Sequence, residues 1–134
     1  MIWINKSGNF RVIYPNQYKG EIGNRAKKYL NGGNGALVGI ELKGGIAAGK
    51  KFIESLKMFY HVANIGDARS LAIHPATTTH SQLNEEELLA SGVTPGYLRL
   101  CIGLEHIDDI IEDLEQALKR TDNVEDINKA KAVG

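Results

Sequence analysis

Apolar residues recur along this chain with two different periods, and the two periods alternate. Where they fall on every second position the pattern predicts a strand, and where they fall on every third or fourth position it predicts a helix. Glycine and proline mark the segments in between. The expected strands are residues 10–14, 36–42, 70–74 and 97–103, and the expected helices are residues 21–30, 46–59, 85–90 and 107–120.

Three of the expected helices carry an apolar stripe, which predicts a buried face. Short helices between short strands in a small chain predict an α+β fold, a small and mostly antiparallel sheet with helices packed on one face. A parallel sheet would also suit the alternating order, but the irregular connections disfavour it. The stripes are Ile22, Ala26 and Leu30; then Ala48, Phe52, Ile53, Leu56 and Phe59; then Ile107, Ile110, Ile111, Leu114 and Leu118.

The strand expected at residues 97–103 alternates cleanly. Leu98 and Leu100 point to one face, and Arg99 and Cys101 point to the other. An arginine is a planar, bidentate donor that matches a carboxylate, and a strand holds it more rigidly than a loop does. Arg99 is therefore either a carboxylate-binding residue or a solvent-facing arginine on an open sheet face. We interpret Cys101 as a packed thiol.

Size, charge and composition narrow the class of protein. A chain of 134 residues fits one domain. Its 16 basic and 16 acidic residues cancel, which disfavours a general nucleic-acid binder. The single cysteine excludes an internal disulfide, and no apolar run is long enough to span a membrane. We expect a cytoplasmic protein with a ragged segment at residues 1–11, a folded domain at residues 12–120 and a polar tail at residues 121–134.

Residues 59–83 contain three of the four histidines and three consecutive threonines. On an extended chain the adjacent Thr79 and His80 would point to opposite faces, so we expect neither to act on the other. The histidine spacing, without a carboxylate one helical turn away, does not match a metal site. We interpret the histidines as capping or packing residues, because a base at His74 or His80 would lack a nucleophile and an orienting carboxylate.

Two further segments have structural interpretations. The glycines at residues 31–35 predict a loop, and a phosphate cradle there would need a strand before it and a helix after it, whereas the helix comes first. The acidic residues after Asn84 predict a helix N-cap with acids in the first turn, where they favour the helix dipole. Neither segment predicts a cofactor or metal site.

Three segments together resemble a known family. They are IELKGG, SLKMFYHVANIGDARSLAIHPATTTHSQL and GVTPGYLRLCIGLEHIDDIIEDLEQAL. These segments are similar to the C-terminal domain of the pyridoxal-phosphate-dependent enzymes of cysteine and methionine metabolism, and most similar to the O-acetylhomoserine sulfhydrylase branch. The resemblance runs from about residue 12 to residue 120 and is weaker over residues 12–35. It implies the C-terminal domain of a fold-type I pyridoxal-phosphate-dependent transferase.

The resemblance also implies roles for three residues. Arg99 matches the arginine that binds the α-carboxylate of the amino-acid substrate. Asn64 matches a position at the edge of the active site where the backbone contacts substrate, and Thr79 matches a threonine near the carboxylate site. Asp67 and Arg69 belong to the same signature, and we interpret them as residues that shape a turn.

The implied cofactor is pyridoxal phosphate, but the family's S-x-T-K context for the cofactor lysine is not found in the sequence. We therefore expect this chain to be the substrate-side domain of an enzyme that converts O-acetylhomoserine and sulfide or a thiol to homocysteine or methionine and acetate. Such a domain would be inactive alone and would need a large cofactor-binding domain or homologous subunits. The alternative is a non-catalytic module that binds a partner subunit or a small carboxylate.

Overall fold

The computed structural model describes residues 9–122 and 124. The predicted order of strands and helices is confirmed, with two short 3-10 helices added. Residues 1–8 of the expected ragged segment, and residues 123 and 125–134 of the expected tail, lie outside the described residues. The elements are β1 (Phe10–Ile13), η2 (Pro15–Gln17), α1 (Gly20–Tyr29), β2 (Leu37–Leu42), α2 (Gly45–Ser55), β3 (Leu71–Ile73), η3 (Pro75–Thr77), α3 (Glu85–Ala90), β4 (Tyr97–Cys101) and α4 (Ile107–Lys119).

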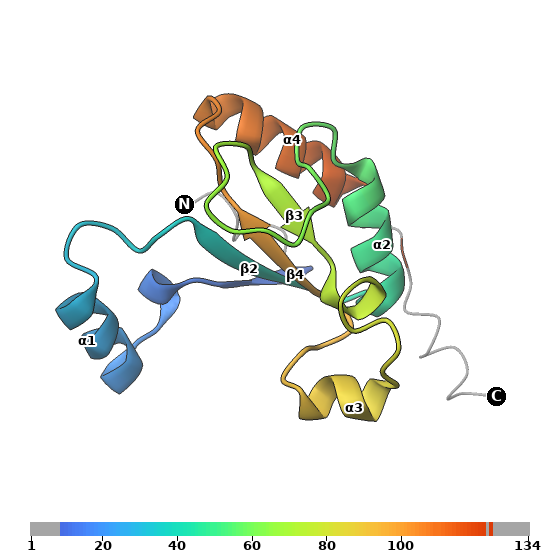
Figure 1. Cartoon of the computed structure of the whole chain (residues 1–134), viewed down its shortest axis with the longest axis horizontal. Coiled ribbons are helices and arrows are strands. Elements are labelled where there is room, and N and C mark those ends of the chain that lie inside the picture. Colours follow the sequence, from blue (N-terminus) through green and yellow to red (C-terminus); the bar gives the residue numbers. More distant parts are fainter. Residues whose placement is uncertain (1–8, 123, 125–134) are drawn as a thin grey trace.

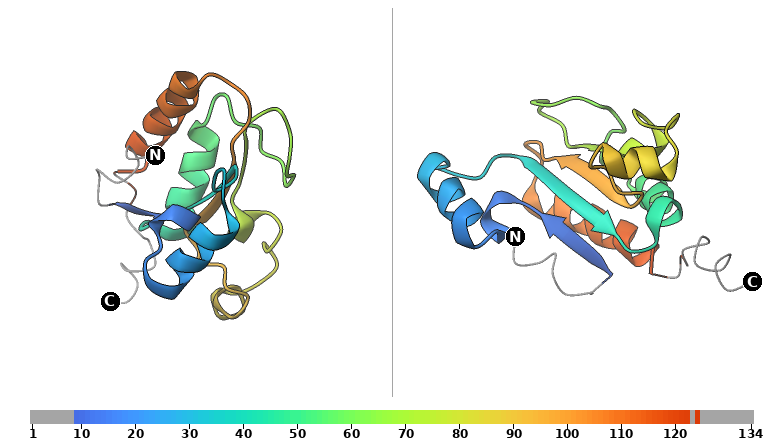
Figure 2. Two further views of the ribbon diagram at one scale, coloured as in Figure 1. Left: turned by 90° about the vertical axis from the view of Figure 1, so that its left-hand side faces the viewer. Right: turned by 90° about the horizontal axis from the view of Figure 1, so that it is seen from below.

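The four strands form one sheet in the order β1-β2-β4-β3, and each neighbouring pair is antiparallel. The predicted α+β fold is therefore confirmed (Figure 1). In the right-hand view of Figure 2, α4 lies on one side of the sheet and the loop that follows α2 lies on the other. Within the described ranges, no helix is long and apolar enough to cross a membrane.

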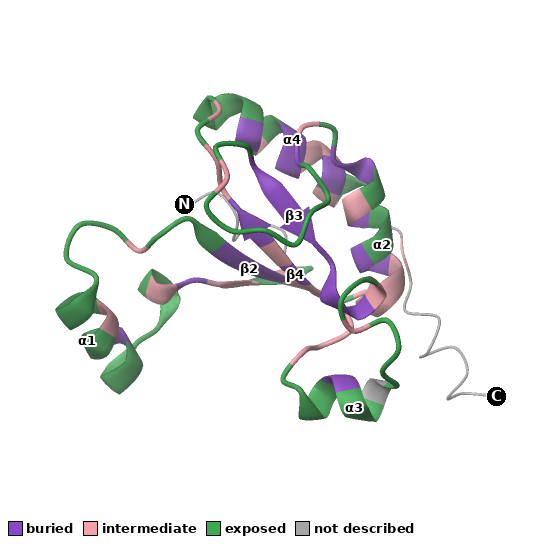
Figure 3. Cartoon of the chain, in the orientation of Figure 1, coloured by how far each residue is buried: buried purple, intermediate pink, exposed green. Residues whose placement is uncertain are grey.

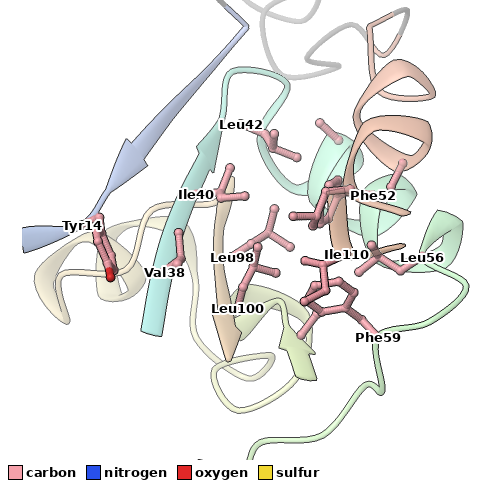
Figure 4. Close-up of a cluster of buried hydrophobic side chains, with 14 residues drawn as sticks. Tyr14, Val38, Ile40, Leu42, Phe52, Leu56, Phe59, Leu98, Leu100 and Ile110 are labelled. Atoms are coloured by element: carbon pink, nitrogen blue, oxygen red, sulfur yellow. The ribbon is translucent and has the colours of Figure 1, made fainter. Parts of the chain in front are cut away.

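The hydrophobic core lies between the sheet and the two helices α2 and α4 (Figure 4). Alternate residues of β2 and β4 point into it, as their sequence pattern predicts. Ile40, Leu98 and Leu100 are each 0% exposed, and Phe52 of α2 packs against them, also 0% exposed. Fully burying a side chain of this size stabilises the folded state by about 1.5–3 kcal/mol. Strand β4, which carries Arg99, is therefore held firmly by the side chains on its core-facing side.

Helix α2 is shorter than predicted: it ends at Ser55, whereas the apolar stripe predicted a helix that continues to residue 59. The backbone of Leu56 is already extended, with ψ of 136°. Just beyond it, the carboxylate of Asp113 on α4 accepts hydrogen bonds from the backbone N–H groups of Lys57 and Met58. These bonds replace helical ones, and Phe59 still reaches the core with 5% of its surface exposed.

Helix α1 forms as predicted, but its apolar stripe is not buried. Ile22 is 57% exposed and Leu30 is 41% exposed. The helix projects away from the sheet in Figure 1, and its residues are mostly exposed in Figure 3. Only Gly23 is buried, because it packs against the backbone oxygen of Tyr18 so closely that a Cβ would not fit.

Candidate functional site

Arg99 lies in the middle of β4, and its side chain points away from the core. Its Nη2 donates a hydrogen bond to the backbone oxygen of Asn64 at 3.3 Å. Its Nε is buried and has no hydrogen-bond partner among the described residues. Two of the three residues expected to bind substrate are thus brought together, and the guanidinium keeps an unused donor. A buried donor without a partner is unfavourable, and a carboxylate is a strong acceptor for it.

Asn64 contacts strand β4 through its backbone carbonyl oxygen. Its carbonyl oxygen accepts a second hydrogen bond from Cys101 Sγ, also at 3.3 Å. The side-chain oxygen of Asn64 is used locally, because it accepts from the N–H of Ile65 at 2.9 Å. Arg99 and Cys101 are two positions apart on β4, so they share a face and can reach one carbonyl together. The packed thiol of Cys101, 6% exposed, agrees with the sequence interpretation.

The loop that carries Asn64 closes on itself at Tyr60 and Ser70. The N–H of Tyr60 donates to the oxygen of Ser70 at 3.0 Å, and the N–H of Ala72 donates to the oxygen of Tyr60 at 2.8 Å. We call residues 61–69 the Asn64 loop. A loop of this length with its ends in contact is an Ω-loop, a form often found at functional sites.

Asp67 and Arg69 shape the end of this loop, as the sequence interpretation proposed. Asp67 Oδ1 accepts from the backbone N–H of Arg69 at 2.9 Å, and the two side chains form an ion pair at 3.4 Å. The hydrogen bond from the Arg69 backbone is the main reason why the pKa of Asp67 is lowered. The Arg69 guanidinium stacks over the ring of Tyr60, 4.3 Å from the ring centre. These contacts are local to the turn.

Tyr97 is a site residue that the sequence reasoning did not name. It precedes Arg99 by two positions on β4 and therefore shares its face. Its ring covers Gly39 of β2, where a Cβ would lie 2.9 Å from Tyr97 Cε2. Burial raises the pKa of the Tyr97 hydroxyl, and the nearby charge of Arg99 acts in the opposite direction. The alternation of residues 97–103 was the signal that would have found it.

Thr79 lies in the turns that follow η3, and the expectation about its neighbour was wrong. Thr79 Oγ1 is 2.8 Å from Nδ1 of His80, a hydrogen bond that the sequence analysis excluded. The segment is a series of turns rather than an extended chain, so the two side chains do not point to opposite faces. Within the described part of the chain, no hydrogen bond joins Thr79 to Arg99 or Asn64.

His74 packs inside the domain, as the sequence interpretation proposed. It is 1% exposed, its Nε2 is 2.7 Å from the oxygen of Pro95, and its Nδ1 is 3.0 Å from Thr77 Oγ1. Burial is the main cause that lowers the pKa of His74, with a further contribution from the charge of Lys50. His106 instead caps α4, where its side chain accepts from the N–H of Asp108.

The described residues fit a substrate carboxylate better than they fit pyridoxal phosphate. Pyridoxal phosphate needs a lysine for a covalent link and a charged partner for its ring nitrogen. Every lysine within the described ranges is exposed. Lys43 shares a cavity with Glu41, but that carboxylate is held by Arg11 at 2.6 Å. In the same residues, no cluster of three or more His, Cys, Asp or Glu side chains is arranged to hold a metal ion.

Comparisons with known proteins agree with this geometry. The family model described as "Cys/Met metabolism PLP-dependent enzyme" matches residues 3–119. The chain is 61% identical over 95 residues to an O-acetyl-L-homoserine sulfhydrylase of Leptospira meyeri, an alignment that covers 70% of this chain and 22% of the relative. It is 48% identical over 85 residues to an L-methionine gamma-lyase of Pseudomonas putida, covering 63% of this chain and 21% of that relative.

A solved structure has the same fold. A Campylobacter jejuni protein assigned as an O-acetylhomoserine (thiol)-lyase superposes with a TM-score of 0.75 at 40% identity, and the match covers 86% of this chain and 28% of that one. That crystal structure contains N′-pyridoxyl-lysine-5′-monophosphate. The chain therefore spans about a fifth of the length of the two curated relatives, at 22% and 21%.

Proposed function

Because the chain belongs to the family of pyridoxal-phosphate-dependent enzymes of Cys/Met metabolism, we propose that it forms the substrate-side domain of an O-acetylhomoserine sulfhydrylase-like enzyme. The reaction proposed is that of O-acetylhomoserine with sulfide or a thiol, which gives homocysteine or methionine and acetate. The relative at 61% identity supports this reaction over that of the lyase at 48%. The free thiol of Cys101 suits the cytoplasm, where thiols stay reduced.

The observation that carries the proposal is the unused donor of Arg99. The strand fixes the guanidinium, Asn64 holds one of its nitrogens, and the buried Nε has no partner among the described residues. An α-carboxylate that displaces the atoms covering Nε would accept from Arg99, while Tyr97 borders it on the same face of the sheet. Arg99 and Asn64 would thus bind and orient the substrate, and Thr79 would lie at the edge of the site.

The reacting chemistry would come from a cofactor-binding domain that works with this one. Pyridoxal phosphate supplies the electron sink of such enzymes. This chain's own contribution would be to hold the amino acid by its carboxylate, which converts a loose encounter into an oriented one. The proposed partners are therefore the amino-acid substrate and a cofactor-binding domain, in an enzyme built from homologous subunits.

Two measurements test the proposal. The purified chain is mixed with pyridoxal phosphate, reduced with borohydride and mapped by mass spectrometry, and we expect only scattered labelling of surface lysines.

An NMR titration of the ¹⁵N-labelled chain with O-acetyl-L-homoserine follows the Arg99 side-chain signal, which we expect to shift. In Arg99→Lys, which keeps the charge but loses the bidentate geometry, the shifts that the ligand causes in the backbone amides of Asn64 and Tyr97 should disappear, and they should persist in the control Arg11→Lys. A single stoichiometric lysine label, or an unmoved Arg99 signal, would overturn the proposal.

A second candidate is a non-catalytic module that associates with a partner subunit. Exposed apolar side chains favour it, since Leu104 is 86% exposed and Tyr29 is 70% exposed. Such side chains often mark interaction surfaces when they gather. Arg99→Ala separates the two candidates, because it should abolish amino-acid binding by a substrate domain and leave a purely structural module unchanged.

A further inference from the structure

The turn between β4 and α4 carries a carboxylate at the base of the Asn64 loop. We propose that Glu105 is a positioning residue, which acts through Ser70 and the Asn64 loop to hold the Asn64 carbonyl against Arg99. Its importance for substrate binding rests on the function proposed above, but the coupling itself is a property of the free chain. Nothing about Glu105 requires that it touch substrate or cofactor.

Glu105 holds Ser70 by two hydrogen bonds at once. Glu105 Oε1 accepts from the backbone N–H of Ser70 at 2.6 Å, and Oε2 accepts from the Ser70 hydroxyl at 2.8 Å. Ser70 is 0% exposed, and its hydroxyl oxygen in turn accepts from the N–H of Gly103 at 2.9 Å. Hydrogen bonds to a charged carboxylate are the strong ones, so Ser70 is fixed in both position and orientation.

The backbone of the β4–α4 turn reinforces this contact. The N–H of Leu104 donates to the oxygen of Ala68 at 2.8 Å. Gly103 lies so close to the Asn64 loop that a Cβ would meet the oxygen of Ala68 and would lie 2.5 Å from the Arg69 carbonyl carbon. The turn after β4 and the base of the loop therefore approach each other more closely than any side chain at position 103 would allow.

The far end of the loop depends on this base. Apolar packing does little to hold it, because Val62 is 48% exposed and Ile65 is 61% exposed. It is hydrogen-bonded to the sheet through the Asn64 oxygen, which lies 3.3 Å from Arg99 Nη2 and from Cys101 Sγ. Bonds of that length are weak, so the loop keeps its place because its base is fixed. Glu105 and Arg99 thus act on opposite ends of the same short loop.

The charge of Glu105 makes its contact with Ser70, and therefore the position of the Asn64 loop, dependent on pH. Burial acts to raise the pKa of this carboxyl, but the hydrogen bonds from Ser70 outweigh it and leave the pKa lowered from its ordinary value. A carboxyl group lowered in this way keeps its bonds above the ordinary glutamate range and loses them as pH falls through the lowered pKa. Asp67 is the acidic neighbour that acts on Glu105, and its own pKa is also lowered.

The test uses the full chain, with no ligand, and follows it by NMR. Glu105→Gln keeps the shape of the side chain but cannot accept from both donors of Ser70, and Ser70→Ala removes the hydroxyl and leaves the Gly103 N–H without its acceptor. Glu112→Gln is the control, because it removes a carboxylate from the exposed side of α4. In Glu105→Gln we expect the Arg99 Nε–H signal to shift or broaden, and exchange of the Leu104 amide to speed up by about tenfold or more. Amides of Ile40, Leu98 and Leu114 should keep their shifts.

A pH series separates positioning from stability. In the wild-type chain the Arg99 signal should hold steady from neutral pH and change only below about pH 4.5. In Glu105→Gln the Arg99 signal should already be shifted at neutral pH, and it should change less as the pH is lowered. An Arg99 signal unmoved by Glu105→Gln and Ser70→Ala, or signals that change throughout the core in proportion, would overturn the inference. If the coupling is seen and O-acetyl-L-homoserine still does not bind, the inference stands and the proposed function fails.

Discussion

The carboxylate of Asp113 on α4 accepts a hydrogen bond from the backbone N–H of Met58 at 2.8 Å. The same carboxylate accepts from the N–H of Lys57 at 2.9 Å, although Asp113 is itself only 6% exposed. These bonds fix the direction in which the chain leaves α2 and enters the segment that leads to the Asn64 loop. They also join α2 to α4 on the core side of the sheet.

Removing this carboxylate should destabilise the domain strongly. Asp113→Ala leaves partly buried N–H groups without acceptors, and we expect a loss of about 2–4 kcal/mol in the free energy of unfolding. Urea denaturation followed by circular dichroism measures the loss. Glu112→Ala, one position away and exposed, should stay within about 0.5 kcal/mol of the wild type. Equal losses in the two variants would contradict this assignment.

Adding a methyl group at Gly49 should destabilise the protein, against the usual trend. In the middle of a helix, glycine to alanine usually stabilises by about 0.5–1 kcal/mol. Here a Cβ would lie 2.6 Å from Cε1 of the buried His74 ring, so the ring or the helix must move. We expect Gly49→Ala to lose about 1–3 kcal/mol in thermal or urea unfolding. A gain in stability would show that the ring has room to move.

Lowering the pH should destabilise the protein, because the buried His74 resists protonation in the folded state. Burial lowers the folded-state pKa of this histidine below its ordinary 6.5, so the unfolded chain binds the proton more tightly. The contribution is present above the unfolded pKa and is lost as pH falls below it. Between about pH 7.5 and about pH 5.5, the unfolding free energy of the wild type should therefore drop more steeply than that of His74→Gln. Parallel curves would count against this explanation.

The Tyr97 ring should be coupled to Gly39. A Cβ on Gly39 would lie 2.9 Å from Tyr97 Cε2 and 3.0 Å from Ile13 Cβ, so Gly39→Ala should cost about 1–3 kcal/mol of stability and displace the ring beside Arg99. In a double-mutant cycle with Tyr97→Ala, the two losses should sum to more than the loss of the double variant. Strict additivity would mean that Ile13 alone causes the crowding.

The sequence was most informative where a single element decides the outcome. The period of two in β4 placed Leu98 and Leu100 in the core and Arg99 opposite them, because alternate strand residues face opposite ways. The Asn84 cap was predictable because it too is local. Its side chain and that of Glu87, three positions later, form the capping box.

What the sequence did not predict depends on residues far apart in the chain. Helix α2 ends early because of a carboxylate 56 positions later. The stripe of α1 is exposed because no described element covers it, which no local pattern reveals. Glu105 and Ser70, 35 positions apart, have no spacing that relates them. The Thr79–His80 bond was missed because the segment forms turns instead of extending.

The sheet order has a consequence for how this domain acquires its site. Strand β4 is the last strand along the chain, yet it lies between β2 and β3 and pairs with both. During synthesis, β1 and β2 can meet as soon as both have been made, whereas β3 has no strand partner until residues 97–101 follow. Pairing of segments so distant along the chain is slow. The arginine that we assign to the substrate therefore arrives with the strand that completes the sheet, so a chain interrupted before β4 would have neither the finished fold nor the binding group.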